Sequence, residues 1–126
     1  MNISPKPEQF FDPCTFPGPY GLTVVGDSME PTLFEDDIIV CDPDAEPMPG
    51  DLVAIFHAKT PGKSIVKRLH MAVPPLDLGV EYKGSVMPLI VVEQDNPKKA
   101  WSLPVSIVKA IHKVVDVRRP SACREH

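Results

Sequence analysis

The stretch Val24–Leu33, VVGDSMEPTL, places a lone serine, Ser28, between an apolar run and a turn that contains Pro31. A serine hydroxyl is a weak nucleophile unless a neighbouring group takes its proton. Either another part of the chain supplies such a base, or Ser28 is an ordinary turn residue. The residues on both sides of this stretch decide between the two interpretations.

Turn-forming residues divide the whole chain into short segments. The 126 residues include 16 prolines and 7 glycines, and 43% of them are hydrophobic. Proline is excluded from helix interiors and central strands, so this composition favours short strands joined by turns. We expect a mostly β single domain of short twisted antiparallel strands with little helix. The expected division is a Pro-rich arm or linker over residues 1–20, the domain over 21–120 and a tail over 121–126.

Apolar runs between the turn signals mark the expected strands. Met29–Phe34 is expected to form one helical turn, with Pro31 near its start. Thr60–Lys63 and Asp95–Pro97 indicate turns, the first of them closing a hairpin. The predicted strands are Leu22–Gly26, Asp36–Cys41, Asp51–His57, Ser64–Leu69, Val80–Lys83, Leu89–Glu93 and, as one long or bulged strand, Val105–Arg118.

Charge and cysteine usage exclude several classes of function. The net charge of −4 argues against direct binding of nucleic acid by the domain, because phosphate binding requires a basic surface. Three widely spaced cysteines without a C-x-x-C pair (Cys14, Cys41 and Cys123) indicate reduced thiols and argue against a disulfide framework or a zinc site. No apolar run approaches the ~20 residues of a membrane helix. We therefore expect a cytoplasmic protein with no membrane segment, metal or cofactor.

Lys67 is the candidate for the missing base. In the strand Ser64–Leu69, alternation places Lys67 on one face with Ile65 and Leu69. Burial there would disfavour the charged amine and lower its pKa, and a neutral amine can accept the Ser28 proton. The strand pattern alone favours the alternative in which Lys67 extends its ammonium into solvent. The histidines of the chain stand in no recognisable catalytic setting.

Three sequence boxes, in order, change that balance. They are GDSMEPTL at Gly26–Leu33, GDLV at Gly50–Val53 and VKRL at Val66–Leu69. The set resembles the LexA-type self-cleaving peptidases, a family that includes LexA, the UmuD mutagenesis proteins and the C-terminal domains of lambda-like phage repressors. The resemblance covers about residues 21–118 and implies a LexA-like, mostly β peptidase fold. It also implies that Ser28 is the nucleophile and Lys67 the general base.

Other residues near these boxes have expected roles. The backbone N–H groups of Asp27 and Ser28 would bind the oxyanion of the reaction. Met29 is expected to pack in the core or to form a wall of the substrate cleft. Arg68, on the opposite face from Lys67, is expected to be a surface or interface charge.

The chain departs from the family around the scissile bond. LexA-like proteins cut themselves at an Ala-Gly or Cys-Gly bond that lies farther from the serine than the 27 residues preceding Ser28 would allow, and neither pair occurs here. Cys14–Pro17, CTFP, resembles the Cys-Gly-Phe-Pro of UmuD proteins with Thr15 in place of glycine. Three expectations follow: the chain is a fragment, a stand-alone peptidase that acts on another chain, or a dimerisation or sensing module with idle chemistry.

Two functions from different classes remain open. The first is a Ser-Lys endopeptidase, as the cleavage and dimerisation domain of a phage-type or SOS-type transcriptional repressor. The resemblance implies as partners a peptide substrate or the chain's own cleavage segment, and a RecA-type filament as a candidate activator. The second is a non-cleaving module that forms a homodimer through Val105–Arg118, if this apolar strand lies at a sheet edge.

A signal-peptidase-like enzyme is a third, weaker interpretation. Signal peptidases share the serine and lysine boxes, but they carry a membrane anchor and a glycine-aspartate-asparagine box. Gln94–Pro97, QDNP, lacks that glycine. Trp101, the lone tryptophan, is expected in the core or at an interface.

Overall fold

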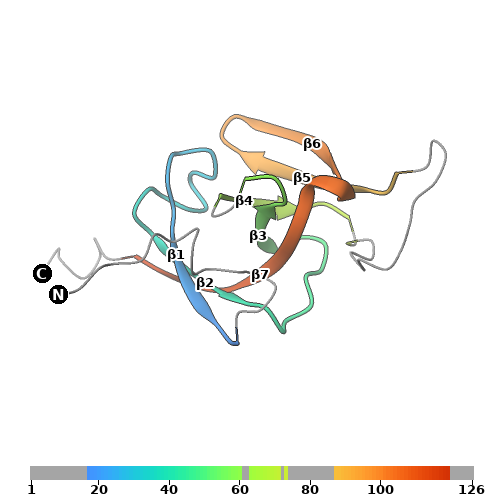
Figure 1. Ribbon diagram of the computed structural model, residues 1–126. Helices are drawn as coiled ribbons and strands as arrows, with labels where there is room; N and C mark the ends of the chain where they lie inside the picture. Colours follow the sequence, from blue (N-terminus) through green and yellow to red (C-terminus); the bar gives the residue numbers. More distant parts are fainter. Residues whose placement is uncertain (1–16, 61–62, 72, 74–86, 120–126) are drawn as a thin grey trace, which may run out of the picture.

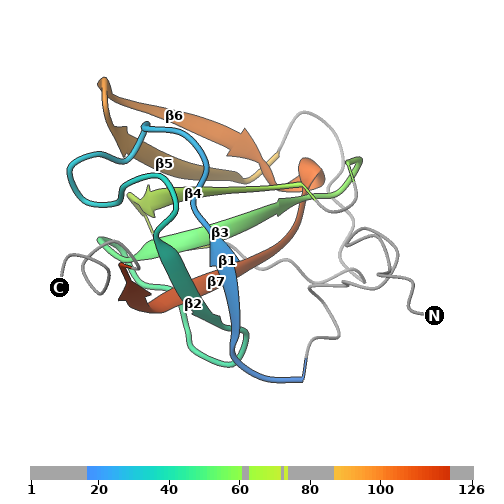
Figure 2. The ribbon, with the colours of Figure 1, turned by 90° about the vertical axis from the view of Figure 1, so that its left-hand side faces the viewer.

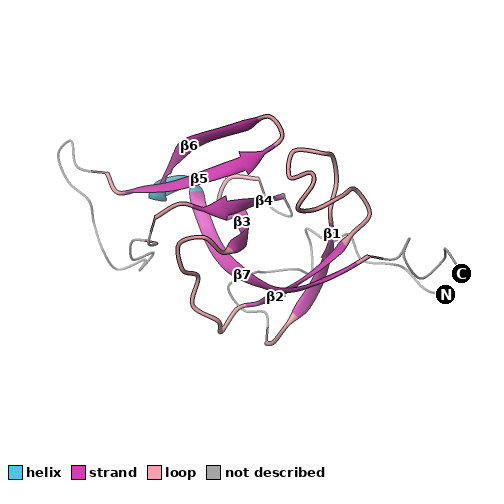
Figure 3. Ribbon diagram, turned by 180° about the vertical axis from the view of Figure 1, so that it is seen from behind, coloured by secondary structure: helices cyan, strands magenta, loops and turns pink. Residues whose placement is uncertain are grey.

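The computed structural model describes residues 17–60, 63–71, 73 and 87–119. Within these residues seven strands form one antiparallel sheet in the order β1-β2-β7-β3-β4-β5-β6 (Figure 1). The elements are β1 Tyr20–Thr23, β2 Ile38–Asp42, β3 Leu52–His57, β4 Ser64–Leu69, β5 Leu89–Asp95, β6 Lys98–Pro104, the short 3-10 helix η1 Val105–Ile107, and β7 Val108–Arg118. The prediction of a mostly β domain with little helix is confirmed, as the secondary-structure colouring in Figure 3 shows.

The core lies on both faces of β3. Ala54 and Phe56 belong to one buried cluster, which also contains residues of the loop between β1 and β2. Val53 and Ile55 point the other way, into a second cluster with β4, β5 and β7. A strand covered on both faces is a continuous apolar run, and this explains why β3 reads Leu-Val-Ala-Ile-Phe.

β7 joins the two halves of the sheet. Its first residues pair with β3 and its last residues pair with β2, and the strand curves between them (Figure 1). The prediction that Val105–Arg118 lies at a sheet edge is therefore wrong. The segment begins with η1, and Val108, Ala110 and His112 are buried because β7 passes through the middle of the sheet.

The remaining differences from the predictions concern strand ends and one additional strand. β4 has the predicted bounds, whereas β1 ends at Thr23 and not at Gly26. The additional strand is β6, which was not predicted because its sequence, KKAWSLP, has no apolar run. It is a strand because it pairs with β5 along its whole length. The predicted strand Val80–Lys83, residues 1–16 of the expected arm and the tail lie outside the described residues.

Candidate active site

A loop between β1 and β2 presents Ser28. Gly26 has a φ of +86°, in the left-handed region that glycine adopts without steric penalty, and the chain turns there. Met29 and Leu33 are 3% and 0% exposed, and they anchor the loop in the first core cluster. The N–H of Leu33 donates to the C=O of Met29, a bond of helical spacing, but the predicted helical turn is a succession of turns without a helix.

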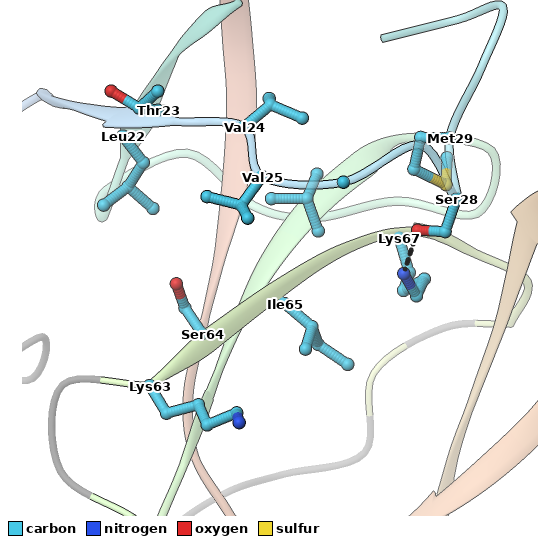
Figure 4. Close-up of a pocket in the computed structure, with 12 residues that line it drawn as sticks. Leu22, Thr23, Val24, Val25, Ser28, Met29, Lys63, Ser64, Ile65 and Lys67 are labelled. Atoms are coloured by element: carbon cyan, nitrogen blue, oxygen red, sulfur yellow. Dashed lines mark hydrogen bonds between the residues drawn. The ribbon is translucent and has the colours of Figure 1, made fainter. Parts of the chain in front are cut away.

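The Lys67 amine lies beside the Ser28 hydroxyl. Lys67 Nζ donates a hydrogen bond to Ser28 Oγ over 2.8 Å (Figure 4). Lys67 is 8% exposed, so the alternative in which its ammonium extends into solvent is wrong. Burial lowers the pKa of Lys67 below its ordinary value, because the charged form loses hydration. The sequence separates these residues by 39 positions, and the fold brings them together.

The turn between β5 and β6 holds the serine loop. The backbone N–H groups of Asp95 and Asn96 both donate to the C=O of Ser28, over 3.1 and 2.8 Å. The Asn96 side chain donates through Nδ2 to the C=O of Asp27 over 3.1 Å. Figure 2 shows the loop after β1 extending to this hairpin. The two carbonyls next to the candidate nucleophile are therefore fixed by a distant part of the chain.

Asp95 also connects the serine loop to β4. Its carboxylate accepts hydrogen bonds from Arg68 Nη1 and from Thr32 Oγ1, and Arg68 Nη2 donates to Thr32 Oγ1 over 3.3 Å. Arg68, whose side chain is 26% exposed, is thus a partly exposed charge that pairs with Asp95. The hydrogen bond from Arg68 is the main cause that lowers the pKa of Asp95. We call Thr32, Arg68, Asp95 and Asn96 the clamp, since they link the loop of Ser28 to the strand of Lys67.

Two backbone N–H groups of the serine loop are open to a ligand. Those of Asp27 and Ser28 donate to no acceptor within the ranges that the structure describes. The carbonyls of the same two residues are held by the hairpin turn. The loop therefore offers paired N–H donors adjacent in sequence to the hydroxyl, a combination that suits a developing oxyanion.

A groove of about 530 Å³ ends at Ser28 and Lys67 (Figure 4). Met29, predicted as a cleft wall or core residue, lines its inner end and is also buried in the core. Val24 already bonds through its N–H and C=O to the segment before β2. Because bonding directions alternate along a strand, the N–H and C=O of Thr23 and Val25 point to the opposite side. The lining consists of Leu22–Gly26, Ser28 and Met29 on one side and Lys63–Lys67 on the other.

Comparison with known proteins gives a family match. The model of the Peptidase S24-like family matches residues 9–78, which include Ser28 and Lys67. The chain belongs to the Peptidase S24-like family. The predicted resemblance to LexA-type peptidases is thereby confirmed at the level of the family. No curated protein and no solved structure matches the chain.

The described histidines of this S24-like domain are bonded to groups other than Ser28. The ring nitrogens of His57, His70 and His112 contact Lys59, Glu93 and Tyr20, respectively. Among the residues with described positions, no group of three or more His, Cys, Asp or Glu side chains is arranged to hold a metal ion. No helix in that part of the chain has the length and apolar character needed to cross a membrane.

The S24-like match ends before the hairpin that completes the site. β5 and β6 supply Asp95, Asn96 and Trp101, and sequence reasoning gave none of these a role in the site. The QDNP turn was the available signal, since an aspartate and an asparagine occur together there. Trp101 is partly buried and packs against the second core cluster.

Proposed function

We propose that this S24-like domain is a serine endopeptidase with Ser28 as nucleophile and Lys67 as general base. The observation that carries the proposal is the 2.8 Å contact between a buried amine and a hydroxyl at the end of a groove. A desolvated lysine loses its proton at a lower pH than a hydrated one, and the neutral amine can then act as a base.

The reaction begins when Lys67 Nζ takes the proton of Ser28 Oγ, which attacks the carbonyl carbon of the scissile bond. The N–H groups of Asp27 and Ser28 donate to the oxyanion of the tetrahedral intermediate. The Lys67 ammonium then returns the proton to the leaving amine, and the C–N bond breaks to leave an ester on Ser28. The same amine activates a water molecule that hydrolyses the ester.

The proposed substrate is an extended peptide, either a segment of the chain itself or of another protein. β1 has β2 as its one partner in the described sheet. The backbone groups of Thr23 and Val25 that point away from β2 can therefore pair with an added strand. Val25 is 84% exposed, so a substrate side chain can pack on it.

The proposed setting follows from the LexA-type resemblance. It is the cytoplasm, where the domain would act as the cleavage and dimerisation part of a phage-type or SOS-type repressor, with a RecA-type filament as activator. The buried free thiol of Cys41 is compatible with a reducing compartment. Adding a RecA-type filament to the chain should accelerate its cleavage. An unchanged rate would contradict this setting and leave the dyad proposal untouched.

The experiment that tests the activity incubates the full chain, alone and with an unfolded protein, from neutral to alkaline pH, with products identified by mass spectrometry. We expect cleavage that disappears in Ser28→Ala and Lys67→Ala and persists in the surface controls Ser106→Ala and Lys59→Met. Cleavage that continues in the Ser28→Ala variant contradicts the dyad. No cleavage by the unchanged chain at any pH favours the non-cleaving module.

A further inference from the structure

The chain's one tryptophan lies against the proposed base. The ring centroid of Trp101 is 5.8 Å from Lys67 Nζ, a distance at which an ammonium and an indole face interact. Trp101 belongs to β6 and Lys67 to β4, so β5 lies between them in the sheet.

The register of the sheet explains this contact. Leu69 of β4 pairs with Val92 of β5, and Val92 pairs with Trp101 of β6. Residues directly opposite one another share a face of a sheet, and so do residues two apart in one strand. Lys67, two residues before Leu69, therefore shares its face with Trp101. The long indole reaches diagonally across β5 to the amine.

The described residues give the Lys67 amine few polar partners. Ser28 Oγ is the one hydrogen-bond acceptor that contacts Nζ in the described ranges. An ammonium has three N–H donors, whereas a neutral amine needs fewer acceptors and can itself accept the hydroxyl proton. An apolar ring beside Nζ occupies space that water would otherwise use to complete the hydration of the ammonium.

We propose that Trp101 is a positioning residue for the base: its indole limits the access of water to Lys67 Nζ and keeps the amine against Ser28 Oγ. This inference rests on the proposed function of the dyad. It assigns a role in the site to β6, the strand that neither the sequence boxes nor the matched residues include.

Two effects of the ring oppose each other. Attraction between the indole face and a cation would raise the pKa of Lys67, whereas exclusion of water lowers it. Burial lowers the pKa of Lys67, and the indole 5.8 Å from Nζ is part of the surroundings that exclude water from the amine. Among the residues with described positions, the charged groups nearest the site are Lys99, 5.6 Å from the same ring, Lys63 at the far end of the groove, the exposed Asp27, and the Arg68–Asp95 pair.

Tryptophan fluorescence tests the contact independently of cleavage. The emission of Trp101 would be recorded from neutral to alkaline pH in Lys99→Met, which removes the second ammonium near the ring, and in the double variant Lys67→Met/Lys99→Met. We expect a step in Lys99→Met that is absent from the double variant, since loss of the Lys67 charge alters the emission. A step that persists in the double variant, or no step in Lys99→Met, would overturn the proposal.

Cleavage kinetics test the consequence for the base. Trp101→Ala should move the acid limb of the pH profile to higher pH, with an about threefold to tenfold lower rate on that limb and little change on the alkaline plateau. The pH profile of Trp101→Phe, which keeps an aromatic ring, should lie between the profiles of the unchanged chain and of Trp101→Ala. This second variant keeps the test valid if Trp101→Ala does not fold. Profiles identical to that of the unchanged chain in both variants contradict the inference. Retained cleavage in Ser28→Ala would instead refute the dyad, while the fluorescence step would still report the Trp101–Lys67 contact.

Discussion

At the scale of single residues, the protonation state of Lys67 controls the proposed reaction. The base must be neutral, and burial lowers its pKa, so cleavage should increase as pH rises through a midpoint below the ordinary lysine value. Lys67→Arg keeps the positive charge at every accessible pH and should lower the rate by about 10²- to 10⁴-fold. Rates measured against pH check this, and an arginine variant with an unchanged profile would show that Lys67 is not the base.

A second residue-scale prediction concerns the buried pair of Tyr20 and His112. The Tyr20 hydroxyl and His112 Nδ1 are 2.5 Å apart, and burial lowers the pKa of His112. Tyr20→Phe should lower the free energy of unfolding by about 1–3 kcal/mol, because it leaves a buried ring nitrogen without its partner. Urea unfolding measures this loss. A stability equal to that of the unchanged chain would mean that the nitrogen finds another partner.

Acid should destabilise the fold through the same histidine. The folded pKa of His112 lies below its unfolded value, so its contribution to stability is complete above about pH 6.5 and is lost as pH falls from there towards the folded pKa. Unfolding followed between neutral and mildly acidic pH should show this decrease. His57→Asn, which changes a histidine outside the core, is the matched control and should keep the decrease.

At the scale of elements, the clamp makes the β5–β6 hairpin part of the site. Asp95→Asn keeps the shape of the side chain but removes the charge that Arg68 and Thr32 contact. We expect a loss of about 1–3 kcal/mol in the free energy of unfolding, together with slower cleavage. Glu93→Gln, a carboxylate on the same strand that pairs with His70, is the matched control. Equal cleavage rates in the two variants would mean that the clamp does not position Ser28.

The elements also show what sequence patterns can and cannot predict. Alternation in Ser64–Leu69 placed Lys67 on the correct face, because that pattern depends on strand geometry alone. β6 was missed because it is stabilised by pairing with β5 and by the packing of Trp101 against the core. Neither contact can be predicted from the local sequence KKAWSLP. The partner of Arg68 was missed for a similar reason, since Asp95 is 27 positions away.

At the scale of the whole molecule, we propose that a homodimer through the C-terminal strand uses an exposed face of β7, because β7 pairs with both β2 and β3. Val115 is 48% exposed and lies at the irregularity in the pairing of β2 with β7, where it has no direct partner. Sedimentation at micromolar concentration should show a dimer that Val115→Lys converts to a monomer. Met48→Lys, in an exposed loop, should not change the dimer. A monomeric unchanged chain contradicts this contact.

Only part of the overall topology could be predicted from the sequence. Composition and turn residues predicted the mostly β domain, and three ordered boxes predicted the two residues that meet in the groove. The central position of β7 could not be predicted, because an apolar strand looks the same whether its second edge faces solvent or another strand.

The most direct measurement of the central claim is the mass of the protein during turnover. The unchanged chain is mixed with a substrate that it cleaves, quenched in acid during turnover and then digested for mass spectrometry. The peptide fragment that contains Ser28 should carry an acyl group. Lys67→Ala should carry none. Active chain that never bears an acyl group on that fragment, or that bears it on a different residue, would contradict nucleophilic catalysis by Ser28.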